Sequence, residues 1–167
     1  MNKSTDRNLQ VERAGAVDWE RYRALRLGAL GESPDAFWTR LDDERDQPDS
    51  FWQGRMGGAV NLIATCDGVD AGLAVVARLR DCPADGGLFS VWVAPTARGL
   101  GVGERLTRAA IEVAREQGFG RLVLEVSDHN APAIRLYARL GFAPTGVSGT
   151  MPAPRDHIPE HQRALVL

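Results

Sequence analysis

A glycine-rich turn separates an apolar run from an amphipathic run near the middle of the chain. Residues 91–103 read V-W-V-A-P-T-A-R-G-L-G-V-G, and Arg98 stands directly before the glycines. From Leu100 to Gln117 apolar residues recur at spacings of three and four, which is typical of a helix with one buried face. The sequence therefore predicts a strand, a turn and a helix in succession. This arrangement suits a phosphate group, because the first amides of a helix have no partner within it.

Several kinds of site use a turn of this type. A P-loop requires Lys and then Ser or Thr after its last glycine, whereas two other charged residues follow Gly103. A dinucleotide fingerprint requires a glycine where this chain has Glu104, although Glu125 stands about twenty residues further on, where that fingerprint places an acid. The pattern R-x-x-G-x-G, formed by Arg98, Gly101 and Gly103, fits without a gap. An ordinary helix start without a ligand is the remaining alternative.

Length and composition exclude several classes of protein. The chain has 167 residues, of which 44% are apolar and 25% charged, the usual balance for a soluble globular protein. We expect one domain over residues 1–167, with a frayed tail at residues 1–7. The net charge of −2 gives no sign of nucleic-acid binding, and no apolar run approaches a membrane span. Cys66 and Cys82 are too few for a disulfide framework, so a cytoplasmic location is expected.

Strand patterns dominate the first half of the chain. Alternating or apolar runs predict strands at residues 9–13, 60–66, 69–79 and 88–93. Asp67-Gly68 is a strong signal for a two-residue hairpin, so these strands should form an antiparallel meander. Between the first two strands we expect a helix that begins after Asp18, followed by two short linked helices within residues 31–55.

The second half adds a crossover. A strand at residues 121–126 follows the central helix, and strand, helix and strand in that order favour parallel pairing. A helix from Asn130 to Leu140, a strand from Phe142, a loop at residues 148–160 and a final strand at residues 162–167 complete the chain. The sequence therefore predicts an α/β fold of the α+β type. It has a mixed sheet of about seven strands, an antiparallel N-terminal half, a central βαβ crossover and helices on both faces.

A second motif makes the assignment specific. The pattern N-x-x-A-x-x-L-Y-x-x-x-G-F is formed by Asn130, Ala133, Leu136, Tyr137, Gly141 and Phe142. With the glycine turn before it, over residues 88–147, the chain resembles the GNAT family of N-acetyltransferases. That resemblance implies a GNAT-like fold and acetyl-CoA as co-substrate.

The resemblance also implies where the cofactor binds. Val91, Trp92 and Val93 lie where the family's strand offers backbone groups to the pantetheine arm. The pyrophosphate is held by backbone amides over a stretch of seven residues, here Arg98, Gly99, Leu100, Gly101, Val102, Gly103 and Glu104. The side-chain amide of Asn130 contacts the cofactor near a V-shaped opening between two strands, and the hydroxyl of Tyr137 faces the thioester sulfur.

Acetyl transfer to a primary amine by direct attack explains these residue types. A backbone amide near residues 91–93 can stabilise the oxyanion. Tyrosine, with a pKa of about 10, stays protonated at neutral pH, so Tyr137 can act as general acid to the departing thiolate. Glu125 is a candidate general base, with a salt-bridged strand charge as the alternative. Asp128 and His129 are expected to be ordinary loop residues, and a relay through water would make a dedicated base unnecessary.

The acceptor is not identified by the sequence. In the family, the segment between the first two helices and the late loop shape the acceptor site, which implies Phe37, Trp38 and residues 151–160 here. A small-molecule or peptide amine is the expected partner, without nucleic acid or membrane, and a homodimer is possible. A non-catalytic acyl-CoA-binding or sensor module is the alternative function, and an oxidoreductase using NAD(P) is a third.

Two further groups of residues are expected to be unremarkable. His157 and His161 have a metal-like spacing, but Pro159 stands between them and no third ligand lies nearby, so no metal site is expected. Scattered arginines, among them Arg13, Arg23 and Arg26, form no cluster in the sequence and are expected at the solvated surface.

Overall fold

The computed structural model describes residues 7–167, so the predicted tail lies outside the described residues except for Arg7. The elements in chain order are β1 (Leu9–Ala14), η1 (Ala16–Asp18), α1 (Trp19–Glu32), η2 (Pro34–Ala36), α2 (Leu41–Glu44), α3 (Asp49–Gly58), β2 (Val60–Cys66), β3 (Val69–Arg78), β4 (Gly86–Val93), η3 (Pro95–Ala97), α4 (Val102–Glu116), β5 (Arg121–Ser127), α5 (Ala131–Arg139), β6 (Ala143–Thr150) and β7 (Pro159–Val166). None of the helices described is long and apolar enough to cross a membrane.

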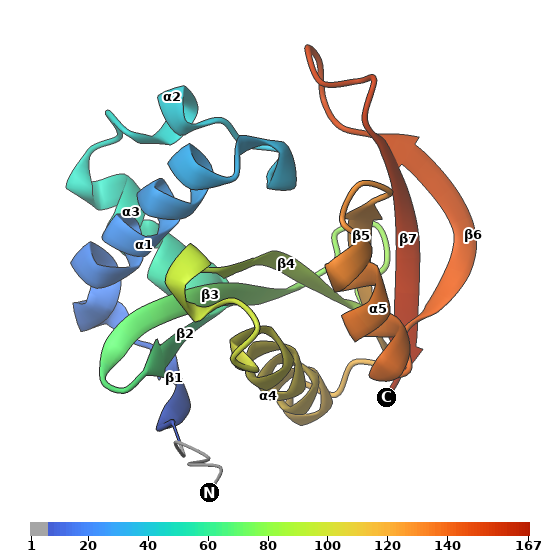
Figure 1. Cartoon of the computed structure of the whole chain (residues 1–167), viewed down its shortest axis with the longest axis horizontal. Helices are drawn as coiled ribbons and strands as arrows, with labels where there is room; N and C mark the ends of the chain where they lie inside the picture. Colours follow the sequence, from blue (N-terminus) through green and yellow to red (C-terminus); the bar gives the residue numbers. More distant parts are fainter. Residues whose placement is uncertain (1–6) are drawn as a thin grey trace, which may run out of the picture.

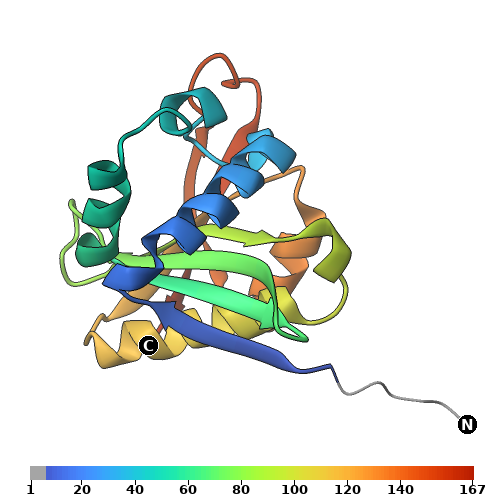
Figure 2. The ribbon, with the colours of Figure 1, turned by 90° about the vertical axis from the view of Figure 1, so that its left-hand side faces the viewer.

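The strands form one seven-stranded mixed sheet in the order β1-β2-β3-β4-β5-β7-β6. The first four strands are antiparallel neighbours, and β4 and β5 are parallel across the α4 crossover. Helices α1, α2 and α3 cover one face of the sheet, and α4 and α5 lie against the other (Figures 1 and 2). The predicted fold class is therefore confirmed.

Local chemistry explains why the predicted turns form. Asp67 and Gly68 both have positive φ, 52° and 80°, which is the conformation of a tight hairpin whose twist matches its strands. Cys66 pairs with Val69 directly across this turn. The hairpin between β2 and β3 is thus fixed by two residues.

Helix α4 packs its apolar face on the middle of the sheet. Val102, Leu106, Ala110 and Val113 are almost fully buried, as the spacing of three and four predicts. Gly72 on β3 permits this approach, because a Cβ atom there would lie 2.6 Å from the Trp92 carbonyl oxygen and 3.0 Å from a Leu106 methyl group. The helix that follows the glycine turn is therefore held firmly by the sheet.

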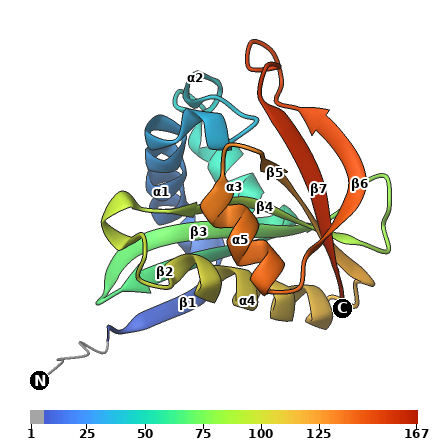
Figure 3. The same cartoon turned by 45° about the vertical axis from the view of Figure 1, so that its right-hand side comes forward.

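The two halves of the sheet separate between β4 and β5. These strands pair only at Gly86 with Leu122 and at Gly87 with Val123. Beyond these pairs, β5, β7 and β6 turn steeply away from β2, β3 and β4 (Figures 1 and 3). The edge of β4 that faces β5 therefore has no strand partner over most of its length, and a V-shaped opening results.

The predicted boundaries near the C-terminus are wrong in one respect. The segment 148–160, predicted as a loop, is strand at both ends, and Ser148, Gly149 and Thr150 pair with His161, Glu160 and Pro159. Strand β6 is mostly solvent-exposed and lies at the sheet edge, so its sequence carries no apolar alternation. Similarly, β4 begins at Gly86, two residues before the predicted start.

Candidate active site

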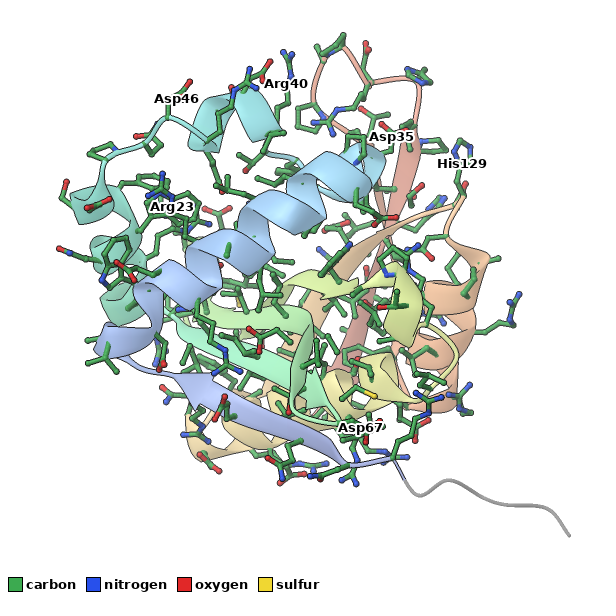
Figure 4. The ribbon with its side chains drawn as sticks, turned by 60° about the vertical axis from the view of Figure 1, so that its left-hand side comes forward. Arg23, Asp35, Arg40, Asp46, Asp67 and His129 are labelled. Carbon is green, nitrogen blue, oxygen red and sulfur yellow. The ribbon has the colours of Figure 1, made fainter. Side chains whose placement is uncertain are left out.

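A cavity of about 740 Å³ lies where β4 and β5 separate. Residues 88–91 of β4 form one wall and residues 124–127 of β5 form another. The segment between α1 and α2 lines it from one helical layer, and Tyr137 of α5 lines it from the other. Figure 4 shows Asp35 after α1 and His129 after β5, which both belong to the lining.

The start of α4 presents a row of unpaired backbone amides. Within the described chain, the N–H groups of residues 99 and 101–104 find no acceptor, and the first bond of the helix runs from the Arg105 amide to the Gly101 carbonyl oxygen at 3.0 Å. Gly99 and Gly101 have φ of 76° and 90°, which glycine adopts without steric cost. Unpaired amides at the positive end of a 15-residue helix form an anion-binding site, so this turn fits a diphosphate group.

The Arg98 side chain is directed to another partner. Its Nη2 donates to Glu32 Oε2 at 2.6 Å and its Nε donates to the Val93 carbonyl oxygen at 3.1 Å. The Trp92 indole also donates to Glu32 Oε2, at 2.9 Å. The bonds from Arg98, Ser33 and Trp92 lower the pKa of Glu32 to about 2. The Arg98 charge is therefore already balanced, and backbone amides are the donors left for an anion.

Tyr137 combines burial with access to the cavity. Its side chain comes from α5, is only 6% exposed, and packs edge-on against Phe142 with ring centroids 5.7 Å apart. Burial raises the pKa of Tyr137 to about 12, so the hydroxyl stays protonated at physiological pH. The hydroxyl has no protein hydrogen-bond partner among the described residues. It is therefore free to donate a hydrogen bond into the cavity.

Glu125 and Glu160 place two carboxylates on the cavity wall. Loss of hydration within the protein raises the pKa of Glu125; the hydrogen bond that Gln162 Nε2 donates at 3.1 Å opposes this, and the charge of Glu160 adds to it. Within the described residues neither carboxylate forms an ion pair with arginine or histidine. Both carboxylates instead accept hydrogen bonds from neutral donors, Glu125 from Gln162 and Glu160 from Trp38.

Asn130 lies between β5 and α5 and lines the cavity. Its side-chain oxygen caps α5 by accepting a hydrogen bond from the Ala133 amide at 3.3 Å. The side-chain nitrogen has no partner in the part of the chain that the structure describes. The cap thus fixes the oxygen and leaves an amide donor available at the opening.

The predicted acceptor residues come together above the same cavity. Phe37 is buried, whereas Trp38 is 59% exposed and donates its indole hydrogen to Glu160 Oε2 at 2.7 Å. Arg155, in the loop between β6 and β7, donates to the carbonyl oxygens of Pro34, Phe37 and Trp38. These bonds, defined here as the Arg155 latch, connect two segments that are 117 or more residues apart in the chain.

His161 has two side-chain partners in the structure. His161 Nε2 lies 2.8 Å from Asp128 Oδ1, and His161 Nδ1 lies 2.8 Å from Ser148 Oγ. Among the described residues no group of three or more candidate ligands could hold a metal ion.

The prediction for Arg26 is wrong, because this residue is buried rather than solvated. It is 3% exposed, lines the cavity and forms a bidentate ion pair with Glu44, which is also 3% exposed. A helical spacing signal was present, since Tyr22, Arg26 and Leu30 stand four residues apart on the buried face of α1. Ser90 also lines the cavity, and no local pattern in the sequence distinguishes it, whereas Glu160 belongs to the segment 151–160 expected at the acceptor site.

Two parallel strands separate here, and the helix beside them begins with unpaired amides. These features are typical of a protein that binds a phosphorylated cofactor with an extended arm. The model of the acetyltransferase (GNAT) family matches residues 19–142, and the chain belongs to this family.

Relatives of known name extend this comparison. Streptothricin acetyltransferase of Streptomyces lavendulae is 51% identical over 59 residues, which is 35% of this chain and 31% of that protein. Mycothiol acetyltransferase of Salinispora tropica is 32% identical over 143 residues, or 81% of this chain and 44% of that protein. The chain thus spans less than half the length of these two curated relatives.

A solved structure shows the same fold. A putative acetyltransferase from Salmonella typhimurium, determined with its cofactor acetyl-CoA, superposes with a TM-score of 0.74 at 22% identity, over 95% of this chain and 94% of that one.

Proposed function

We propose that this chain transfers the acetyl group of acetyl-CoA to a primary amine by direct attack within a ternary complex. The observations that carry the proposal are the row of unpaired amides at the start of α4, the helix that follows β4 in the chain, and the opening between β4 and β5. A diphosphate on these amides leaves the unpaired edge of β4 for the amide groups of the pantetheine arm, which can bind it as an added strand does.

The proton movements follow from the side chains at the cavity. Glu125 accepts a proton from the ammonium group of the acceptor, and the neutral nitrogen attacks the thioester carbonyl carbon. When the tetrahedral intermediate collapses, the C–S bond breaks and Tyr137 donates its proton to the thiolate of CoA. The extra proton on the attacking nitrogen then passes to the Tyr137 phenolate, which leaves a neutral amide and restores the acid. The raised pKa of each residue supports its role, because a base needs affinity for a proton and an acid must still hold one.

The charge of the cavity supports an amine as acceptor. Glu125 and Glu160 are acids on one wall whose hydrogen bonds come from the neutral donors Gln162 and Trp38, and an ammonium group would supply both positive charge and further N–H donors. The exposed indole face of Trp38 beside Glu160 can also bind a cation. Relatives named streptothricin acetyltransferase and mycothiol acetyltransferase are consistent with a small-molecule acceptor.

Binding of the cofactor provides the test. At a concentration about 100 times its Kd, acetyl-CoA should stabilise the folded chain by about 2.7 kcal/mol, which raises Tm by roughly 5–10 °C. NADPH should have no such effect, and release of free thiol should depend on an added amine. A folded sample whose Tm does not change in millimolar acetyl-CoA would refute the proposal. Tight binding without transfer to any amine would favour the sensor instead.

A further inference from the structure

Strand β4 carries a bulge at the point where it passes the cavity. Leu73 pairs with Trp92 and Val75 pairs with Phe89, so Ser90 and Val91 both stand opposite Ala74. Ser90 has a φ of +56°, a left-handed conformation that is strained for a residue with a side chain. Such a conformation persists only where its surroundings hold it, and these positions concentrate at functional sites.

One side-chain hydrogen bond reaches this bulge from another element. Ser90 Oγ accepts a hydrogen bond of 2.7 Å from Arg26 Nη1, which comes from α1 on the covering layer. Ser90 makes no other side-chain hydrogen bond within the described part of the chain.

Arg26 is itself fixed from several directions. Its Nε and Nη2 donate to Glu44 Oε2 and Oε1 at 3.0 and 3.1 Å, and its guanidinium group lies 5.0 Å from the centre of the Phe37 ring. Arg55 donates to Glu44 Oε1 at 2.8 Å and holds the carboxylate from the other side. A buried ion pair adds little net stability, because desolvation offsets the attraction, but its directional bonds define positions closely.

We propose that Arg26 is a positioning residue for acetyl transfer. Held by Glu44, it fixes the bulge at Ser90 and so directs the backbone amide of Val91 toward the thioester carbonyl oxygen. Each of its three nitrogen atoms has a protein partner, and the role proposed for Arg26 is to act through Ser90 rather than on the substrate. This inference depends on the proposed function, and it adds a residue outside both sequence motifs.

The test compares kcat and KM in four proteins: the wild type, Ser90→Ala, Arg26→Lys and the double variant. Ser90→Ala removes only the acceptor oxygen, and lysine at position 26 cannot bind both carboxylate oxygens and Ser90. We expect each single variant to lose about 10- to 100-fold in kcat, with KM for acetyl-CoA within about twofold of wild type. The double variant should lose no more than the worse single variant, because both changes break one connection.

Arg23→Lys is the matched control. Arg23 lies on the same helix and contacts Asp49 and the Trp52 ring, outside the cavity lining (Figure 4). It should keep the wild-type kcat.

A second measurement, the NMR signal of the Val91 amide, can be made without knowing the acceptor. In the wild type, the amide resonance of Val91 should differ between the CoA and acetyl-CoA complexes, and Ser90→Ala should abolish that difference while retaining affinity for CoA. Ser90→Ala with full kcat or an unchanged Val91 signal would overturn the inference, as would losses that multiply in the double variant. If Arg26→Lys does not fold, Ser90→Ala alone decides. A wild type that binds no acetyl-CoA would instead refute the proposed function, and this inference with it.

Discussion

The two tyrosines of the chain differ in what surrounds their hydroxyl groups, although both rings are buried. Tyr137 faces the cavity, whereas Tyr22 is 0% exposed and its hydroxyl is a buried polar group with no hydrogen-bond partner among the described residues. Burial alone therefore does not make a tyrosine a proton donor. The access of Tyr137 to the opening between the strands is what supports its proposed role.

Removing the Tyr137 hydroxyl should lower kcat without weakening acetyl-CoA binding. We expect Tyr137→Phe to lower kcat by about 100-fold or more, since general acid catalysis contributes factors of this size. Calorimetry should show acetyl-CoA affinity close to that of the wild type. Tyr22→Phe is the control and should retain full activity. Wild-type kcat in Tyr137→Phe would exclude this residue as the acid.

Glu125 should set the acidic limb of the pH profile. A base acts in its deprotonated form, and the pKa of Glu125 lies above the ordinary value of 4.5. The rate should therefore rise with pH through a midpoint above 4.5, and Glu125→Gln should remove that limb. Because the pKa of Tyr137 is about 12, the acid stays protonated throughout. An unchanged profile in Glu125→Gln would point to water as the proton acceptor.

The turn before α4 has both a backbone conformation that favours glycine and a row of unpaired amides. Substitutions can separate the effects of these two properties. Gly101 and Gly118 flank the helix, both have positive φ, 90° and 71°, and each would be strained by a side chain. Only the amide of Gly101 belongs to the unpaired row. The conformational cost and the effect on binding should therefore be distinguishable.

Alanine at the two glycines should give similar stability and different binding. Each of Gly101→Ala and Gly118→Ala should cost about 1 kcal/mol in the free energy of unfolding. Gly101→Ala should also weaken acetyl-CoA binding by about tenfold or more, because the side chain would displace the unpaired amides of the turn. Gly118→Ala should bind normally. Equal affinity in both variants would indicate that the turn does not hold the diphosphate.

The Arg155 latch joins the segment after α1 to the loop between β6 and β7. Arg155→Ala removes its bonds to three carbonyl oxygens, so both segments lose their mutual support. We expect KM for the amine to rise by about tenfold, since Trp38 and Glu160 would no longer be held together, while acetyl-CoA binding is unchanged. Arg45→Ala, which loses exposed ion pairs with Asp42 and Asp46, is the control. Unchanged KM in Arg155→Ala would separate the latch from acceptor binding.

Three carboxylates make the whole molecule sensitive to acid. The pKa of Glu32 is about 2 beside Arg98, and Arg121 lowers that of Asp85. Burial acts to raise the pKa of Glu44, but the arginines beside it outweigh this and lower it. These groups take up protons more readily in the unfolded chain. Their stabilisation is complete above the ordinary values of 3.8–4.5 and is lost as the pH falls toward each folded value.

Thermal melts across this range provide the measurement. Tm should be nearly constant between about pH 6 and pH 7 and should fall steeply below about pH 4.5. Glu44→Gln should lower Tm at neutral pH and flatten the acidic decline, because one of the three groups no longer titrates. A Tm at pH 3 equal to that at pH 6 would contradict this account.

The features that were predicted correctly depend on interactions between residues close together in the sequence. The Asp67-Gly68 hairpin, the apolar stripe of α4, the Asn130 cap and the parallel crossover each depend on residues within a few positions or on one strand–helix–strand unit. Dihedral preferences, spacing and capping act over these distances, so the sequence alone determined the glycine turn, the mixed sheet and the family motifs.

Contacts between distant segments were decided only by the tertiary structure. The insertion of β7 between β5 and β6, the bond between Trp38 and Glu160 across 122 residues, and the burial of Arg26 against Glu44 all depend on how complete elements pack. An arginine has the same local signature whether it meets water or a buried carboxylate. Its environment is set by the long-range pairing that brings α1, α2 and the bulge of β4 together, and no short stretch of sequence contains that information.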